Sequence, residues 1–134
     1  MISIGANYEL NFSFTQENVN DFCKVSGDFN PLHWDEAFAA NTPFKKPIVH
    51  GALVNSIFSK VMGMDFPGKG SVYLKQISDF KRPVYVGLPY RAYFEVITID
   101  ANKHTAEIKT QVFEMERGKL MVDGVATVMN QELF

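Results

Sequence analysis

Cysteine is almost absent from this sequence, and the single Cys23 excludes a disulfide within the chain. Its apolar neighbours Val19 and Phe22 are typical of a small core residue and not of a nucleophile. The first residues lack the charged and apolar regions of a signal peptide. No apolar run approaches the ~20 residues that a membrane span needs. These features together predict a cytoplasmic protein without a membrane partner.

Excess charge of either sign is also lacking, because the formal net charge is −2 over 134 residues. Without a basic stripe, a nucleic-acid partner is not expected. Hydrophobic residues make up 46% of the chain and aromatic residues 13%, which is enough to fill a core and argues against disorder. There are no repeats or linker-like segments. The sequence therefore predicts one domain over residues 1–134.

The most informative segment, residues 26–33, places a carboxylate and an imidazole on one short loop. Gly27 permits a sharp change of direction, and Pro31 is expected to exclude helix around it. The shape of the loop must then bring Asp28 and His33 together. Such a pair can hold a water molecule and move its protons, which is general acid–base chemistry. A second interpretation is a turn capped by Asp28 with His33 packed nearby, and the segment alone favours neither.

Hydrophobic periodicity predicts a strand, three helices and four further strands, in that order. Alternation over residues 8–14 is typical of a half-buried strand. Thr15 is expected to cap a helix that ends near Gly27, and Asp35 to cap a second short one. Residues 52–63 are apolar around most of a helical circumference, which predicts an enclosed helix. The remaining chain alternates with turn signals between, which predicts strands over 70–80, 90–100, 104–116 and 119–130.

Three motifs occur in a fixed order: Gly-Asp-Phe-Asn-Pro-Leu-His at 27–33, Pro-Ile-Val-His-Gly at 47–51, and Pro-Gly-Lys-Gly-Ser-Val-Tyr-Leu at 67–74. Together they resemble the MaoC-like hydratases, and specifically the short bacterial (R)-specific enoyl-CoA hydratases, over nearly the whole chain. The resemblance implies an α+β hot-dog fold, a curved antiparallel sheet of about five strands around one central helix, as the predicted elements also indicate. It also implies a homodimer or a dimer of dimers.

The resemblance further implies a reaction and catalytic residues. Relatives add water syn and reversibly to trans-2-enoyl-CoA, which gives (R)-3-hydroxyacyl-CoA, and Asp28 with His33 matches their catalytic pair. Which of the two acts as base and which as acid stays open. Ser59 falls on a serine that the family uses beside this pair, although the spacing alone favours a hydroxyl bonded to its own helix. Asn55, one turn earlier, replaces a small apolar residue and is expected to affect the acyl pocket.

Binding roles follow from position and charge. Gly51 opens the apolar helix, where unpaired N–H groups carry the positive end of the dipole, so it is expected to polarise the thioester carbonyl. His50, just before it, is assigned with Asn30 and Asn55 to substrate binding, since a histidine at a helix start is more often a hydrogen-bond partner than a base. The basic residues expected to meet the coenzyme A phosphates, or else to be plain solvated surface, are Lys69, Lys81 and Arg82.

No cofactor is expected, because coenzyme A is part of the substrate. No metal is expected either, since Asp28, His33 and Asp35 lack a recognisable ligand spacing. The alternatives are a hot-dog acyl thioesterase, an acyl-carrier-protein dehydratase, and a non-catalytic module that binds acyl thioesters. A thioesterase does not need the 27–33 motif, and the presence of both Asp28 and His33 argues against the non-catalytic module. Acyl-chain length, carrier and pathway stay open, with polyhydroxyalkanoate precursor supply as one role among relatives.

Overall fold

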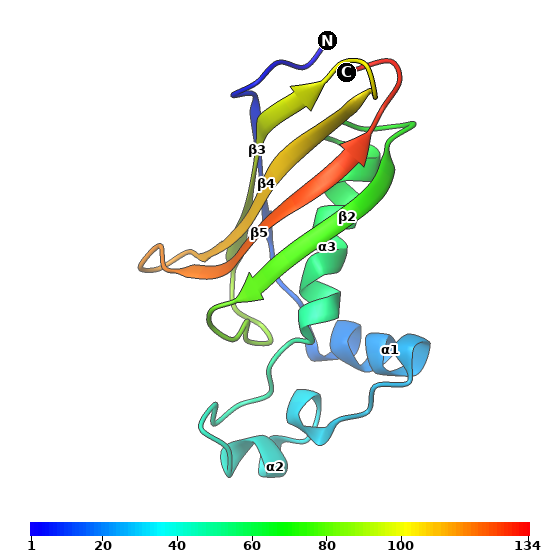
Figure 1. The fold of residues 1–134 in the computed structure, drawn as a ribbon. Coiled ribbons are helices and arrows are strands. Elements are labelled where there is room, and N and C mark those ends of the chain that lie inside the picture. The colour runs from blue at the N-terminus through cyan, green and yellow to red at the C-terminus, as the bar shows by residue number, and fades with distance from the viewer.

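The computed structural model describes all residues from 1 to 134. A five-stranded antiparallel sheet, in the order β1-β3-β4-β5-β2, curves around one long helix (Figure 1). The elements are β1 (Asn7–Phe12), α1 (Gln16–Ser26), α2 (Glu36–Ala40), α3 (Gly51–Met64), β2 (Val72–Phe80), β3 (Tyr90–Asp100), β4 (Thr105–Glu114) and β5 (Leu120–Met129). Each predicted helix and strand is present, with small shifts at the ends. The architecture is the predicted hot-dog fold.

The apolar side of α3 packs into the concave face of the sheet, and it contributes Leu53, Val54, Phe58, Val61 and Met62 to a single core of 22 buried residues. The ring of Phe58 meets that of Phe94 on β3 edge to face, with centroids 5.7 Å apart. The sequence predicts a helix enclosed on all sides, but only one sheet covers it within the protomer. The opposite side therefore remains exposed, at Ala52, Ser56, Ser59 and Lys60.

Capping interactions fix the ends of α1 where the sequence predicts them. The Thr15 hydroxyl accepts the N–H of Asn18, and the Asn18 side chain accepts the N–H of Thr15. At the other end Gly27 adopts a left-handed φ of 81°, and its N–H donates to the carbonyl of Cys23 at 2.8 Å. A residue with a Cβ is strained in this conformation, so glycine defines the exit. Asp28 is therefore the first residue of the loop.

The loop after Asp28 contains a helical turn, which corrects the expectation that Pro31 excludes helix around it. Pro31–His33 form a single 3₁₀ turn, η1, with the proline in its first position. A missing N–H costs nothing there, because that group has no partner inside the turn. The Asn30 side chain caps the turn by accepting the N–H of Leu32 at 3.2 Å. The turn directs His33 inward, where it is 9% exposed.

The segment with α1, η1 and α2 lies beyond the N-terminal end of α3, past the end of the sheet (Figure 1). The catalytic candidates thus sit where this segment meets the helix. Strand β2 forms one edge of the sheet, and it carries exposed apolar side chains at Val72, Tyr73, Leu74, Ile77 and Phe80. None of the helices has the length and apolar character that crossing a bilayer requires.

Candidate active site

Asp28, His33 and His50 meet at the N-terminal end of α3, although they come from separate parts of the chain. One ligand atom of each lies within 4.8 Å of the other two. His33 and His50 are buried, whereas the Asp28 side chain is 51% exposed. The structure therefore brings the sequence-predicted pair together at a boundary between the interior and solvent.

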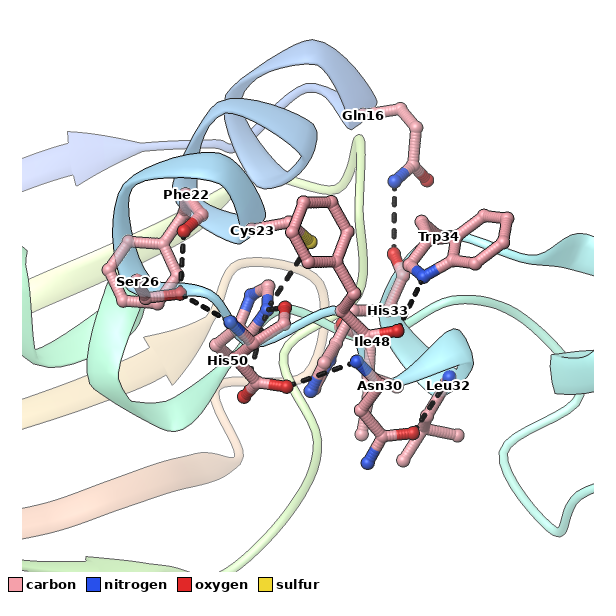
Figure 2. A network of polar contacts seen from close by, with 12 residues as sticks. Gln16, Phe22, Cys23, Ser26, Asn30, Leu32, His33, Trp34, Ile48 and His50 are labelled. Carbon is pink, nitrogen blue, oxygen red and sulfur yellow. Dashed lines mark hydrogen bonds and ion pairs between the residues drawn. The ribbon is translucent and has the colours of Figure 1, made fainter.

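The orientation of His33 is fixed through its Nδ1 atom, which lies 2.7 Å from the carbonyl oxygen of Ile48 (Figure 2). A carbonyl only accepts, so Nδ1 carries a hydrogen and donates it, which leaves Nε2 as the ring nitrogen without a partner in the protein. The main-chain carbonyl of His33 accepts the Gln16 side-chain N–H at 2.9 Å, which holds the turn against α1. Nε2 is consequently the ring atom of His33 that can exchange protons.

Asp28 caps a turn, which was the alternative interpretation of this segment, and its side chain also faces the histidines. Its Oδ1 accepts the N–H of Asn30 at 3.1 Å, and its own N–H donates to the Ser26 hydroxyl at 3.1 Å. Oδ2 lies 4.0 Å from Nε2 of His50. The two interpretations are thus compatible, because the turn uses one carboxylate oxygen and leaves the other beside the imidazoles.

A pocket of about 430 Å³ opens beside His33 and Gly51. Of the predicted basic residues, Lys81 and Arg82 line it. Among the aromatic residues the pocket includes Phe44 and Phe80, whereas Phe58 is fully buried in the core. The full lining is His33, Phe44, Ile48, Val49, Gly51, Val54, Phe80, Lys81, Arg82, Pro83 and Val84. Such a concave site with few polar groups is typical of small-molecule binding.

The start of α3 supplies free hydrogen-bond donors at this pocket. His50 is the N-cap residue, and its side chain does not cap the helix. The first helical N–H with an acceptor is that of Val54, which donates to the His50 carbonyl at 3.0 Å. The N–H groups of Gly51, Ala52 and Leu53 have no acceptor in the protein. Gly51 is the pocket residue among them, so its N–H is placed to bind a ligand oxygen.

Two predicted residues on α3 lie farther along the helix. The Asn55 side-chain oxygen accepts the Ser78 hydroxyl of β2 at 3.0 Å. Ser59 is exposed and its hydroxyl has no hydrogen bond within the protomer. It lies two turns beyond Gly51, ~12 Å along the axis at 1.5 Å per residue. The serine that bonds back to its own helix is Ser56, whose hydroxyl donates to the Leu53 carbonyl at 2.6 Å.

The other predicted residues, Asn30 and Lys69, do not line the pocket of His33. Asn30 uses its side-chain oxygen to cap η1. Lys69 lies past the C-terminal end of α3, in a hollow with Asn130 and Glu132, and does not line the pocket of His33. Sequence reasoning missed the carbonyl of Ile48, since a main-chain acceptor leaves no signal in residue types. It also missed Phe80 as the neighbour of Gly51, a contact made by residues far apart in the chain.

The cluster of Asp28, His33 and His50 does not fit a metal ion in this arrangement. The two imidazole rings are stacked, with centroids 3.7 Å apart and planes 26° apart. Ring lone pairs lie in the plane of the ring, so those of the two stacked rings lie in two separate, nearly parallel planes. A transition metal requires lone pairs that converge on one point at ~2.0–2.1 Å.

The fold and the site define a hot-dog protein with an Asp/His pair at the start of its central helix. The chain belongs to the MaoC-like family, whose domain description it matches over residues 3–127. It is similar to the (R)-specific enoyl-CoA hydratase of Aeromonas caviae, at 44% identity over 95% of this chain and 94% of that protein. The solved structure of the (R)-hydratase from that organism, described as involved in PHA biosynthesis, has a TM-score of 0.92, with 96% and 97% of the two chains covered.

A relative with a different carrier also matches. The mitochondrial 3-hydroxyacyl-acyl-carrier-protein dehydratase of Arabidopsis thaliana is 33% identical over 87% of this chain and 70% of that protein. A hydratase adds water and a dehydratase removes it, so the two names describe opposite directions of one type of reaction. The comparisons thus agree on the type of reaction and differ in the group that carries the acyl chain.

Proposed function

We propose that this protein is an (R)-specific enoyl-CoA hydratase, which reversibly adds water to trans-2-enoyl-CoA. The observation that carries the proposal is the convergence of Asp28 and His33 within 4.8 Å, next to a pocket with a free helix N-terminus. One water molecule can hydrogen-bond to two groups at that separation. The similarity to the hydratase of Aeromonas caviae over nearly the full length of both chains supports the same activity.

Asp28 and His33 are proposed to transfer the protons between the water molecule and C2 of the substrate. In the hydration direction the water oxygen bonds to C3, one proton leaves the water, and one proton reaches C2. His33 takes part through Nε2, because Nδ1 is held by Ile48. The exposed carboxylate oxygen of Asp28 is the second exchange site. The pair accepts one proton and delivers one in each turnover, so it returns to its starting state. Delivery from one side of the double bond gives syn addition, and the similarity to the (R)-specific hydratase of Aeromonas caviae supports the (R)-3-hydroxyacyl product.

Gly51 is proposed to stabilise the negative charge that develops on the thioester oxygen. Its unpaired N–H lies at the positive end of the α3 dipole. A donor of this kind contributes most in the transition state, where the oxygen becomes enolate-like. The absence of a side chain lets the substrate carbonyl approach the backbone closely. The pocket thus provides both proton transfer at His33 and oxyanion binding at Gly51.

Lys81 and Arg82 are proposed to contact the coenzyme A moiety at the pocket rim. The Arg82 guanidinium donates to the carbonyl of Leu120 at 2.8 Å, which fixes its position. The Lys81 ammonium has no partner within the protein. Free coenzyme A is the preferred carrier, because the near-neutral chain offers no dense basic patch for an acidic carrier protein. The reaction as proposed uses no cofactor or metal.

We also propose a homodimer, or a dimer of dimers, formed through β2. An exposed edge strand with apolar side chains is a site for pairing with a second chain. On α3, Gly51 and Asn55 face Phe80 and Ser78 of this strand, and helical spacing continues the same face to Ser59. A partner at β2 would therefore come close to Ser59. The buried free thiol of Cys23 agrees with a cytoplasmic location.

The direct test is hydration of crotonyl-CoA by the purified protein, with chiral analysis of the product. We expect (R)-3-hydroxybutyryl-CoA, formed reversibly. The (S)-product would contradict the proposed (R)-specificity. Release of free coenzyme A without hydration would instead identify a thioesterase. A higher kcat/KM on the same acyl group attached to acyl carrier protein would assign the dehydratase role.

A further inference from the structure

His50 is buried between α1 and the loop that carries Asp28 and His33, and its side chain contacts residues of both. It is 3% exposed. Its Nε2 lies 3.2 Å from the main-chain carbonyl oxygen of Asp28 and 3.6 Å from Sγ of Cys23 (Figure 2). The Asp28 carbonyl can only accept, so Nε2 carries the hydrogen and donates it. The His50 side chain thus ties the loop of Asp28 to the start of α3, next to Gly51.

The ring of His50 is also held by aromatic contacts. It stacks on the ring of His33 at a centroid distance of 3.7 Å. Phe22 of α1 meets it edge to face, with centroids 4.8 Å apart. Through these contacts His50 touches both members of the proposed catalytic pair, one by a hydrogen bond and one by its flat face. Movement of the His50 ring would shift Asp28 and His33 together.

His50 itself is poorly suited to proton transfer. Its Nδ1 is a buried atom without a hydrogen-bond partner, so a proton there would have no acceptor. Burial lowers the pKa of His50, and the neighbouring His33 lowers it further, against opposing effects of the Asp28 carbonyl and carboxylate. The other titratable group in contact is Cys23, whose thiol pKa burial raises. His50 therefore remains a neutral ring beside the groups that exchange protons.

We propose that His50 is a positioning residue for the Asp28–His33 pair, an inference that rests on the proposed function. Its Nε2–H holds the loop at the Asp28 carbonyl, and its face supports the His33 ring. The Asp28 carboxylate and the His33 ring then keep the separation within 4.8 Å that one water can bridge. This differs from the sequence-based prediction that His50 binds substrate, because its one free polar atom is buried and the rest of the ring contacts protein.

Two amide substitutions separate this role from a general structural one. The amide nitrogen of His50→Gln reaches the place of Nε2 and can still donate to Asp28. The shorter side chain of His50→Asn cannot reach it. Because a misplacement of ~1 Å costs about 10²-fold in rate, we expect kcat of His50→Asn on crotonyl-CoA to fall by about 10²-fold. The conservative His50→Gln should restore about tenfold or more of that loss, and KM should change little in either variant.

The matched control is His104, whose Nδ1 donates to the carbonyl of Phe134 at 2.7 Å, away from the pocket. His104→Gln and His104→Asn should have equal, near wild-type kcat.

If His50→Asn does not fold, His50→Phe replaces it as the variant without a donor. Equal kcat for folded variants with and without the donor would overturn the proposal. A raised KM at unchanged kcat would overturn it in favour of direct substrate contact. Wild-type protein without hydratase activity would instead reject the proposed function.

Discussion

The ring tip of Phe80 lies against the backbone of Gly51, so closely that a Cβ on Gly51 would be 2.8 Å from Cζ of Phe80. This contact joins the end of β2 to the start of α3 at the pocket. Phe80 is half exposed and its ring is the end of a movable side chain. A methyl group at residue 51 would therefore displace the ring and also occupy the approach to the free N–H.

Gly51→Ala should impair catalysis more than folding. We expect an unfolding free energy within about 1 kcal/mol of wild type, because the ring can move. The turnover of crotonyl-CoA should fall by about 10–10²-fold, because the methyl group keeps the thioester oxygen from the N–H. The control is Gly124→Ala, whose Cβ would lie 2.5 Å from the main-chain oxygen of Ile77. Main-chain atoms cannot yield easily, so this variant should lose about 2–3 kcal/mol. Urea titration measures the two unfolding free energies, and kinetics measure the turnover. A lower unfolding free energy for Gly51→Ala than for Gly124→Ala would contradict the prediction.

Lys81 and Lys69 offer a paired test of the coenzyme A contact. Lys81 lines the pocket of His33, whereas Lys69 lies beyond the opposite end of α3. Exposed charge pairs contribute only about 0.2–1 kcal/mol, so Lys81→Gln should raise KM about 1.4–5-fold with kcat preserved. Lys69→Gln should leave KM unchanged. The difference should shrink as salt screens the phosphates. Equal KM values for the two variants would remove Lys81 from the binding site.

Ser59 and Ser56 separate a functional hydroxyl from a structural one. Ser59 has no hydrogen bond in the protomer, whereas Ser56 donates to Leu53. Ser59→Ala should therefore retain its thermal stability. We expect it to lower kcat, as the resemblance implies, with a partner subunit at β2 placing Ser59 near a substrate. Ser56→Ala should leave kcat unchanged. Unaltered kinetics in Ser59→Ala would show that Ser59 is surface only.

Stability should depend on pH through His50. Its pKa in the folded protein is lowered from the ordinary value of 6.5, so the unfolded chain binds a proton more readily. The stabilisation from the neutral buried ring is complete above the ordinary pKa of 6.5. It is lost as the pH falls from there towards the lowered pKa of the folded protein. One such group contributes at most about 1.4 kcal/mol per pH unit. Urea titrations at about pH 7.5 and about pH 5.5 should show a smaller loss for His50→Gln than for wild type. An identical loss would mean that His50 is protonated normally.

Local signals in the sequence predicted most of the fold. Thr15 and Gly27 bound α1 through capping geometry that depends on neighbouring residues only. The exposed side of α3 could not be read in this way, because its apolar and small residues do not reveal that a single sheet covers it. The prediction that Pro31 excludes helix around it was wrong, because a proline that ends an α-helix also fits the first position of a 3₁₀ turn.

The candidate site was predicted where its residues lie on one short segment. Asp28 and His33 are five positions apart, so the loop between them decides their approach. The contacts of His50 with Phe22, Cys23 and the Asp28 carbonyl depend on how α1 packs beside α3. Residue types carry no signal for such packing. The sequence therefore indicated His50 as a residue of interest without indicating its contacts.

The most direct test of the central claim is the turnover of crotonyl-CoA by Asp28→Asn and His33→Gln, each verified as folded by circular dichroism. Both substitutions keep the approximate size of the side chain and remove its ability to exchange a proton at neutral pH. We expect each to lower kcat by about 10²–10⁴-fold, the usual contribution of a positioned acid or base. Near wild-type turnover in both folded variants would contradict the assignment of this pair as the catalytic centre.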